Sequence, residues 1–129
     1  MQTVAIIGLG RVGGALAVSL PRDRYMVRQI VYRSDRFLDA VAARVGPGLK
    51  GVGYNAIDQV DCDIVFITTQ DFEIENAVSE LRGKLRRRSA VFHTSGSKSS
   101  LVLSSLGDAD RCIGSFHPLV SVPRPELGP

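Results

Sequence analysis

The sequence predicts an α/β protein built on a doubly wound parallel sheet, a three-layer arrangement with helices on both faces. Two observations predict this fold class. Short β-branched and apolar runs alternate along the chain with segments whose apolar residues recur at helical spacing. The run "DIVFITT" at 63–69 is almost unbroken in apolar character, as expected of a central parallel strand covered on both faces. Right-handed crossovers between such strands give the sheet order 3-2-1-4-5-6.

The first half of the chain holds three expected strands and two helices. The first strand is 3–8, and the helix at 12–20 ends before Pro21, since proline cannot continue a helix. The second strand is 26–32, followed by a helix at 35–45 with Asp35 as its N-cap, and a weak third strand lies at 50–54. We expect the first helix to turn one face inward, made of Val12, Ala15, Leu16, Ser19 and Leu20.

The second half continues the alternation. After the fourth strand we expect a helix at 71–81, capped by Asp71 and facing the sheet with Ile74, Ala77, Val78 and Leu81. A strand at 89–94, a short helix at 99–106 and a last strand at 111–116 follow. Residues 1–122 are expected to form one domain, and the proline-rich 123–129 a linker or the cut end of a longer chain.

Composition excludes several classes of protein. The 129 residues are 44% apolar and 22% charged, the balance of a globular domain, and no apolar run approaches the length of a membrane span. The net charge of +3 suits an anionic ligand and is too weak to indicate nucleic acid. The basic run at 82–88 lacks interleaved aromatics and is expected to be a solvated helix end and loop. Cys62 and Cys112 are expected to be buried free thiols, which favours a reducing cytoplasm.

A glycine-rich turn, "IIGLGRVGGALA", directly follows the first strand and opens the first helix. In this context the G-x-G-x-x-G pattern of Gly8, Gly10 and Gly13 is a dinucleotide-binding fingerprint. Gly8 permits the tight turn, Gly10 allows close approach of a pyrophosphate, and Gly13 allows helix and strand to pack closely. With Arg11 and Val12, these residues form the expected pyrophosphate loop at the helix N-terminus. The alternative is a fold of this kind that has lost its ligand.

The end of the second strand indicates which dinucleotide is bound. An acidic residue usually stands there and accepts hydrogen bonds from the ribose hydroxyls. This strand instead ends in "VYRSD", and Arg33 with Ser34 suits a 2′-phosphate, so NADP is the expected cofactor and NAD the less favoured one. Arg33 as a solvated surface arginine is the alternative.

Polar residues at three later strand ends point to where chemistry would occur, because ligands of open α/β sheets lie beyond the carboxyl ends of the strands. Thr68 and Thr69 are expected along the cofactor, and His93, Ser95 and His117 are the expected acid–base or hydroxyl-polarising residues. The alternatives are threonines that merely end a strand and a histidine that merely hydrogen-bonds a loop. A serine-hydrolase interpretation fails because the chain lacks the G-x-S-x-G elbow, and no metal site is expected.

Taken together, "IIGLGRVGGALA", "VYRS", "DIVFITTQD", "VFHTSGS" and "GSFHPLVSV" resemble one group of proteins. These are two-domain oxidoreductase-like proteins that pair a Rossmann-like N-terminal domain with a helical C-terminal domain. They are related to pyrroline-5-carboxylate reductase, prephenate dehydrogenase and the β-hydroxyacid dehydrogenases. The resemblance implies hydride transfer between NADP and a small acid, alcohol or imine, with the site residues above in the roles given. Gln70 departs from the pattern, since such proteins often have proline there.

The resemblance also implies partners. The helical domain that would complete the substrate pocket is not part of these 129 residues, so a missing domain or partner chain is expected, and a homodimer is compatible with the pattern. Two functions remain open. The chain is either the NADP-binding domain of an oxidoreductase or a non-catalytic module that binds or senses NADP(H).

Overall fold

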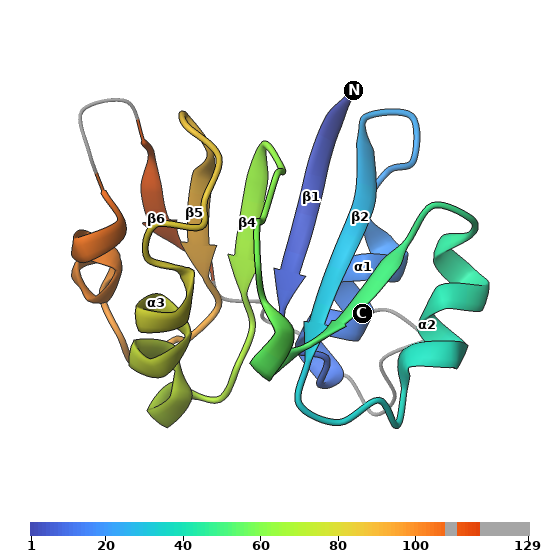
Figure 1. The fold of residues 1–129 in the computed structure, drawn as a ribbon, viewed down its shortest axis with the longest axis horizontal. Coiled ribbons are helices and arrows are strands. Elements are labelled where there is room, and N and C mark those ends of the chain that lie inside the picture. Colours follow the sequence, from blue (N-terminus) through green and yellow to red (C-terminus); the bar gives the residue numbers. More distant parts are fainter. Residues whose placement is uncertain (108–110, 117–129) are drawn as a thin grey trace.

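The described part of the chain forms a six-stranded parallel sheet, as predicted. The computed structural model describes residues 1–107 and 111–116. The strands are β1 (Gln2–Ile7), β2 (Tyr25–Tyr32), β3 (Lys50–Gly53), β4 (Ile64–Ile67), β5 (Ala90–His93) and β6 (Ile113–Ser115). Their order, β3-β2-β1-β4-β5-β6 with every pairing parallel, confirms the predicted topology (Figure 1). The order reverses between β1 and β4, where ligands of open α/β sheets bind.

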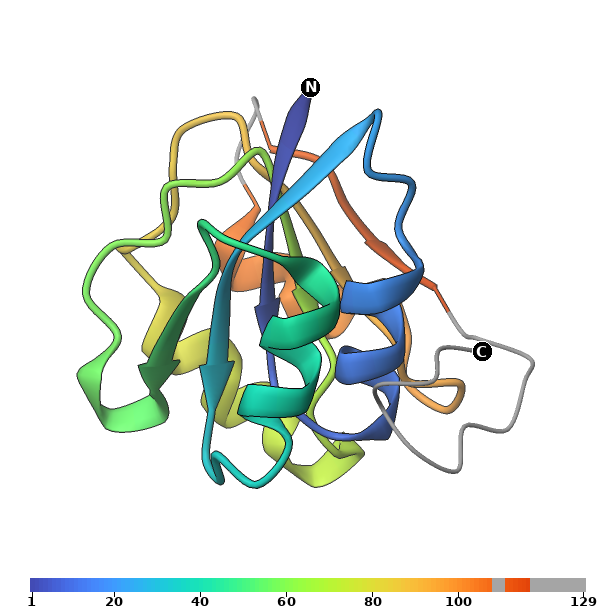
Figure 2. The same cartoon turned by 90° about the vertical axis from the view of Figure 1, so that its right-hand side faces the viewer.

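Helices cover both faces of the sheet. The α-helices are α1 (Arg11–Ser19), α2 (Leu38–Val45) and α3 (Ile74–Leu81), and the 3₁₀ segments are η1 (Tyr54–Ala56), η2 (Asp71–Glu73) and η3 (Ser100–Leu106). One apolar cluster joins the sheet to α3 and η3, and a second joins it to α1 and α2. Figure 2 shows α1 and α2 side by side on their face. All four inward residues predicted for α3 are buried, which confirms that periodicity.

Two predicted helix caps are wrong. Neither Asp35 nor Asp71 caps an α-helix with its side chain: α2 begins at Leu38 after Phe37, and α3 begins at Ile74 after Glu73. Asp35 accepts the Leu38 N–H through its backbone carbonyl, so a turn precedes the helix. Asp71 lies in the short η2 segment. In both places the chain makes a tight turn before the helix, and this turn moves the aspartate outside the first helical turn.

The inward face of α1 also differs from the prediction. Ala15 is buried and Leu16 and Leu20 pack against the core, as predicted, but Ser19 is exposed. The helix also buries Gly13, Gly14 and Ala17. Small residues occupy buried positions of α1 because the helix lies too close to the sheet for larger side chains.

The covering of β4 also differs from the prediction. Ile64 and Phe66 are only half-buried, so the strand is not fully covered on both faces as expected.

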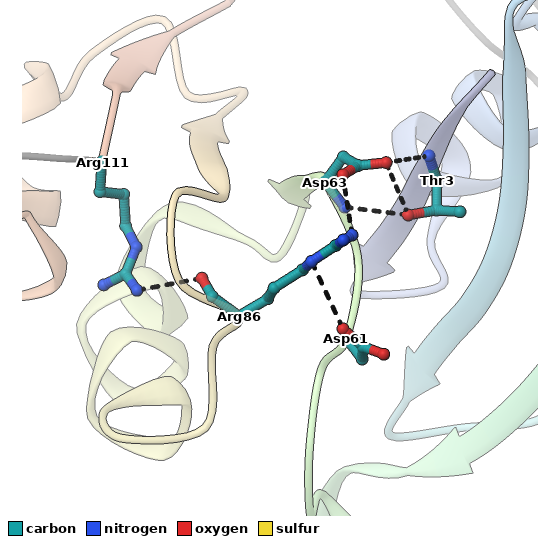
Figure 3. A network of polar contacts seen from close by, with 5 residues as sticks. All are labelled: Thr3, Asp61, Asp63, Arg86 and Arg111. Carbon is teal, nitrogen blue, oxygen red and sulfur yellow. Dashed lines mark hydrogen bonds and ion pairs between the residues drawn. The ribbon is translucent and has the colours of Figure 1, made fainter.

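A polar network joins the starts of β1 and β4 at the amino edge of the sheet (Figure 3). Asp63 Oδ2 accepts hydrogen bonds from the Thr3 N–H at 2.8 Å and the Thr3 hydroxyl at 3.1 Å, while the Asp63 N–H donates to that hydroxyl. Arg86 Nη1 donates to Asp63 Oδ1 at 2.8 Å. These bonds, led by the one from the Thr3 backbone, hold the pKa of Asp63 below its ordinary value. The network secures the edge opposite the predicted ligand site.

The structure also bears on the predicted burial of the two cysteines and on the length of the helices. Both cysteines are free thiols, as predicted, and Cys62 is buried, which raises its pKa. Cys112 is exposed, so its predicted burial is wrong: it lies just before the short strand β6 at the edge of the sheet. No helix among residues 1–107 and 111–116 is long and apolar enough to cross a membrane.

Candidate functional site

The glycine-rich turn lies at the carboxyl end of β1, between that strand and α1. Gly8 has a φ of +113°, a conformation that residues with a Cβ rarely adopt, and its N–H donates to the Val31 carbonyl of β2 at 2.8 Å. A Cβ on Gly8 would lie 2.9 Å from the Thr69 backbone nitrogen. The turn is therefore packed tightly against the ends of β2 and β4.

Gly13 lies in a tightly packed environment, whereas Gly10 borders open space. A Cβ on Gly13 would lie 2.1 Å from the Gly8 carbonyl oxygen and 2.5 Å from Thr68 Oγ1, so α1 can lie this close to β1 only with glycine there. A Cβ on Gly10 would meet nothing within 4 Å. The Gly10 backbone thus borders open space at the N-terminus of α1, where unpaired N–H groups favour an anion.

Hollows adjoin one another along the carboxyl edge of the sheet, and two of them are lined by residues of the glycine turn. We call the first, of about 200 Å³, the glycine cleft; among its lining residues are Gly8, Gly10, Arg33, Ser34, Thr68 and Thr69. The second, of about 560 Å³, is the strand-edge hollow, lined in part by Gly10, Arg11, Val12, Thr68, Thr69 and Thr94. All nine residues predicted to bind the cofactor therefore either line these hollows or, for Gly13, support their wall.

The two threonines at the end of β4 play different parts. Thr68 Oγ1 donates to the Gly8 carbonyl oxygen at 2.7 Å, and its buried side chain thus fixes the glycine turn to β4. Thr69 Oγ1 is buried and has no hydrogen-bond partner among the described residues. A buried hydroxyl without a partner is costly, so one that borders a cleft is suited to a polar ligand atom.

Arg33 extends from the end of β2 into the glycine cleft, where it makes two contacts. Its Nη1 is 2.6 Å from Glu73 Oε1, and its guanidinium lies over the Tyr54 ring, 5.6 Å from the centroid. Burial, then Glu80, raise the pKa of Tyr54, whose hydroxyl has no partner in the described part of the chain. Ser34 Oγ accepts the Arg36 N–H at 3.3 Å. Arg33 and Ser34, both exposed at this strand end, form a donor set that fits a phosphorylated dinucleotide.

His93 lies away from both hollows. Its side chain is fully buried at the end of β5, where Nδ1 accepts the Ser95 N–H at 3.1 Å and Nε2 lies 2.9 Å from the Ser99 carbonyl oxygen. This pattern assigns a neutral ring with its proton on Nε2. Both nitrogens hold the loop after β5, which is the alternative that the sequence left open. The geometry lends no support to His93 as an acid–base residue.

Ser95 belongs to a small hydroxyl chain that ends at the strand-edge hollow. Its Oγ is 3.2 Å from Ser97 Oγ, and the Ser97 hydroxyl donates to Asp71 Oδ2 at 2.7 Å. The bond from Ser97 lowers the pKa of Asp71, so this carboxylate is charged at neutral pH. Asp71 lines the hollow, whereas Ser95 is buried behind it. His117, the third predicted catalytic residue, lies outside the described residues.

Sequence reasoning missed three residues of the site: Tyr54, Glu73 and Asp71. All three follow the carboxyl end of a strand, Tyr54 after β3 and the other two after β4. That position was the available signal, because the carboxyl ends of parallel strands meet at one edge. Asp71 was assigned to a helix cap instead, and nothing in the sequence pairs Glu73 with Arg33, 40 residues earlier.

Comparison with known proteins agrees with this arrangement. Residues 3–94 match the model of the family described as NADP oxidoreductase, coenzyme F420-dependent. A search of the curated proteins finds no significant match.

Several solved structures share the fold. A candidate NADP oxidoreductase from Bacteroides fragilis superposes with a TM-score of 0.73 at 18% identity, over 94% of this chain and 45% of that one. Synechocystis arogenate dehydrogenase superposes with a TM-score of 0.68 at 19% identity, over 94% of this chain and 42% of that one. Prephenate dehydrogenase from A. aeolicus, solved with hydroxyphenyl propionate and NAD+, superposes with a TM-score of 0.63 at 19% identity, over 92% of this chain and 42% of that one. The chain spans less than half the length of each.

A doubly wound sheet with a glycine turn at its switch point, matched by such neighbours, defines a Rossmann-like fold. Within that fold class, this chain belongs to the NADP oxidoreductase, coenzyme F420-dependent, family.

Proposed function

We propose that this chain is the NADP(H)-binding domain of an oxidoreductase. The observation that carries the proposal is the contrast within the glycine turn: Gly13 is closed by backbone and Thr68, whereas Gly10 faces open space at the start of α1. This contrast suits a turn built to bring a pyrophosphate against backbone N–H groups. The unpartnered Thr69 hydroxyl beside it supports a ligand in the same cleft.

Selection of NADP over NAD is assigned to Arg33 and Ser34. Arg33 lines the glycine cleft together with Gly8 and Gly10, and its guanidinium can pair with a 2′-phosphate. The Tyr54 ring beneath the guanidinium holds it over the cleft. Ser34 adds a hydroxyl donor at the same strand end.

When bound, the nicotinamide would donate or accept the hydride, and the proposed substrate is a small acid, alcohol or imine. The strand-edge hollow, with Thr68, Thr69 and Thr94 along it, is where this chain's residues would orient the reacting end of the cofactor. The chain spans less than half of its structural neighbours, so we propose that a helical domain, a partner chain or a second copy completes the substrate pocket. The free cysteines favour a cytoplasmic setting.

A non-catalytic module that binds or senses NADP(H) is the second candidate. The observation in its favour is that both ring nitrogens of His93 are engaged by the loop after β5. Binding is common to both candidates. The two candidates differ in turnover, measured with the chain joined to a completing domain and a small hydroxy acid or imine as substrate. Turnover favours the oxidoreductase, and binding without turnover favours the non-catalytic module.

The test of binding is calorimetric titration of the 129-residue chain with NADPH and, separately, with NADH. NADPH should bind more tightly, and Arg33→Ala should remove the difference. Arg36→Ala, an equal loss of charge at an exposed position three residues on, is the matched control and should keep it. Gly10→Ala should fold normally and bind both nucleotides weakly, because its methyl group enters the space assigned to the pyrophosphate. If the chain binds neither NADPH nor NADH, the proposal is refuted.

A further inference from the structure

Glu73 places a carboxylate inside the glycine cleft, against the residue assigned to the 2′-phosphate. Its Oε1 lies 2.6 Å from Arg33 Nη1, and both side chains line the cleft. The Glu73 side chain is 14% exposed, whereas that of Arg33 is 59% exposed. The carboxylate is thus the sheltered member of the pair, and the guanidinium presents its remaining donors to solvent.

This carboxylate reaches the end of β2 from another part of the chain. Glu73 lies in η2, after β4, and β1 separates β4 from β2 in the sheet. The end of the second strand, where an acidic residue usually stands, carries Arg33 and Ser34 here. The tertiary structure therefore supplies both a guanidinium and a carboxylate at one subsite.

We propose that Glu73 is a specificity-determining residue that limits the preference for the 2′-phosphorylated cofactor, an inference that rests on the proposed NADP(H) function. The carboxylate neutralises Arg33 and takes one of its donors. A 2′-phosphate must then share or displace that ion pair, and it meets a like charge a few ångströms away. A ribose with a free 2′-hydroxyl meets no such repulsion, and the carboxylate can accept its hydrogen bond.

Arg33 does not depend on Glu73 alone for its position. The Tyr54 ring lies 5.6 Å from the guanidinium carbon and holds the arginine over the cleft from a different element, η1. We therefore expect Arg33 to stay over the cleft when the charge of Glu73 is removed, with its own charge no longer neutralised. This is why we assign Glu73 a competing role and not that of a residue that positions Arg33.

The test measures the ratio of NADPH to NADH affinity in the 129-residue chain and in Glu73→Gln. The glutamine keeps length and shape and removes the charge. We expect NADPH to bind about three- to tenfold more tightly and NADH to change by less than about twofold. Glu75→Gln makes the same charge change at an exposed position of α3 and should leave the ratio unaltered. Adenosine 2′,5′-bisphosphate, titrated in parallel, should follow NADPH.

Each other outcome has one meaning. An unchanged or lower ratio in Glu73→Gln, with far-UV circular dichroism and urea midpoint as in the wild type, overturns the inference while NADP(H) binding stands. An equal rise in Glu75→Gln also overturns it, because the effect is then one of net charge. If the unaltered chain binds neither nucleotide, the proposed function fails and the inference falls with it.

Discussion

Replacing Gly13 by alanine tests how closely α1 must lie against β1. The new methyl group would stand 2.1 Å from the Gly8 carbonyl oxygen and 2.5 Å from Thr68 Oγ1. A carbon needs about 3.3 Å from a carbonyl oxygen, so the helix start must move by about 1 Å. Neither atom can yield easily, because one is backbone and the other donates a 2.7 Å hydrogen bond to it.

The expected cost follows from three contributions. Overpacking of a tight contact costs about 1–3 kcal/mol, and weakening the Thr68 bond costs about 1 kcal/mol more. Alanine in place of glycine within a helix returns about 1 kcal/mol. Gly13→Ala should therefore lower the free energy of unfolding by about 1–3 kcal/mol. In Gly10→Ala the methyl group meets nothing within 4 Å, so the change should be within about 0.5 kcal/mol.

Urea unfolding followed by far-UV circular dichroism measures both variants, since the chain has no tryptophan for fluorescence. The two variants should differ in stability and in binding. Gly13→Ala should be less stable than the wild type, and Gly10→Ala should be as stable as the wild type but deficient in nucleotide binding. Equal stability of Gly13→Ala and the wild type would refute the close packing described here. Loss of stability in Gly10→Ala would show that its surroundings are not open.

Two further predictions concern polar groups outside the glycine turn. The folded protein lowers the pKa of Asp63, so the stabilisation is present above the unfolded pKa of about 4 and is lost as the pH falls through the lower folded value. Asp63→Asn should cost about 1 kcal/mol at pH 7, with the difference shrinking as the pH falls below about 4, as measured by urea midpoints against pH; a constant difference would contradict the role of the charge. His93→Phe should cost about 1–3 kcal/mol by urea unfolding, because the buried Ser95 N–H loses its partner, and a variant as stable as the wild type would show that the ring does not hold this loop.

The sequence by itself determined the fold class, the strand order and the place of the glycine turn. These follow from local patterns: apolar runs of strand length, helical periodicity such as that of Ile74, Ala77, Val78 and Leu81, and glycines between a strand and a helix. Each signal lies within about a dozen consecutive residues. Right-handed connections and a glycine turn directly after the first strand together indicate the dinucleotide-binding type of doubly wound sheet, whose usual strand order is the one observed.

Tertiary structure decided which polar side chains act together. Glu73 meets Arg33 across 40 positions of sequence, and Thr68 fixes Gly8 across 60. His93 lies at the carboxyl edge of the sheet, as predicted, but its ring faces the loop after β5. There it hydrogen-bonds the Ser95 N–H and the Ser99 carbonyl. A strand end can be read from periodicity, whereas the direction of its side chain depends on neighbours that only folding brings near. The balance of charge in the cleft is for that reason a property of the folded chain.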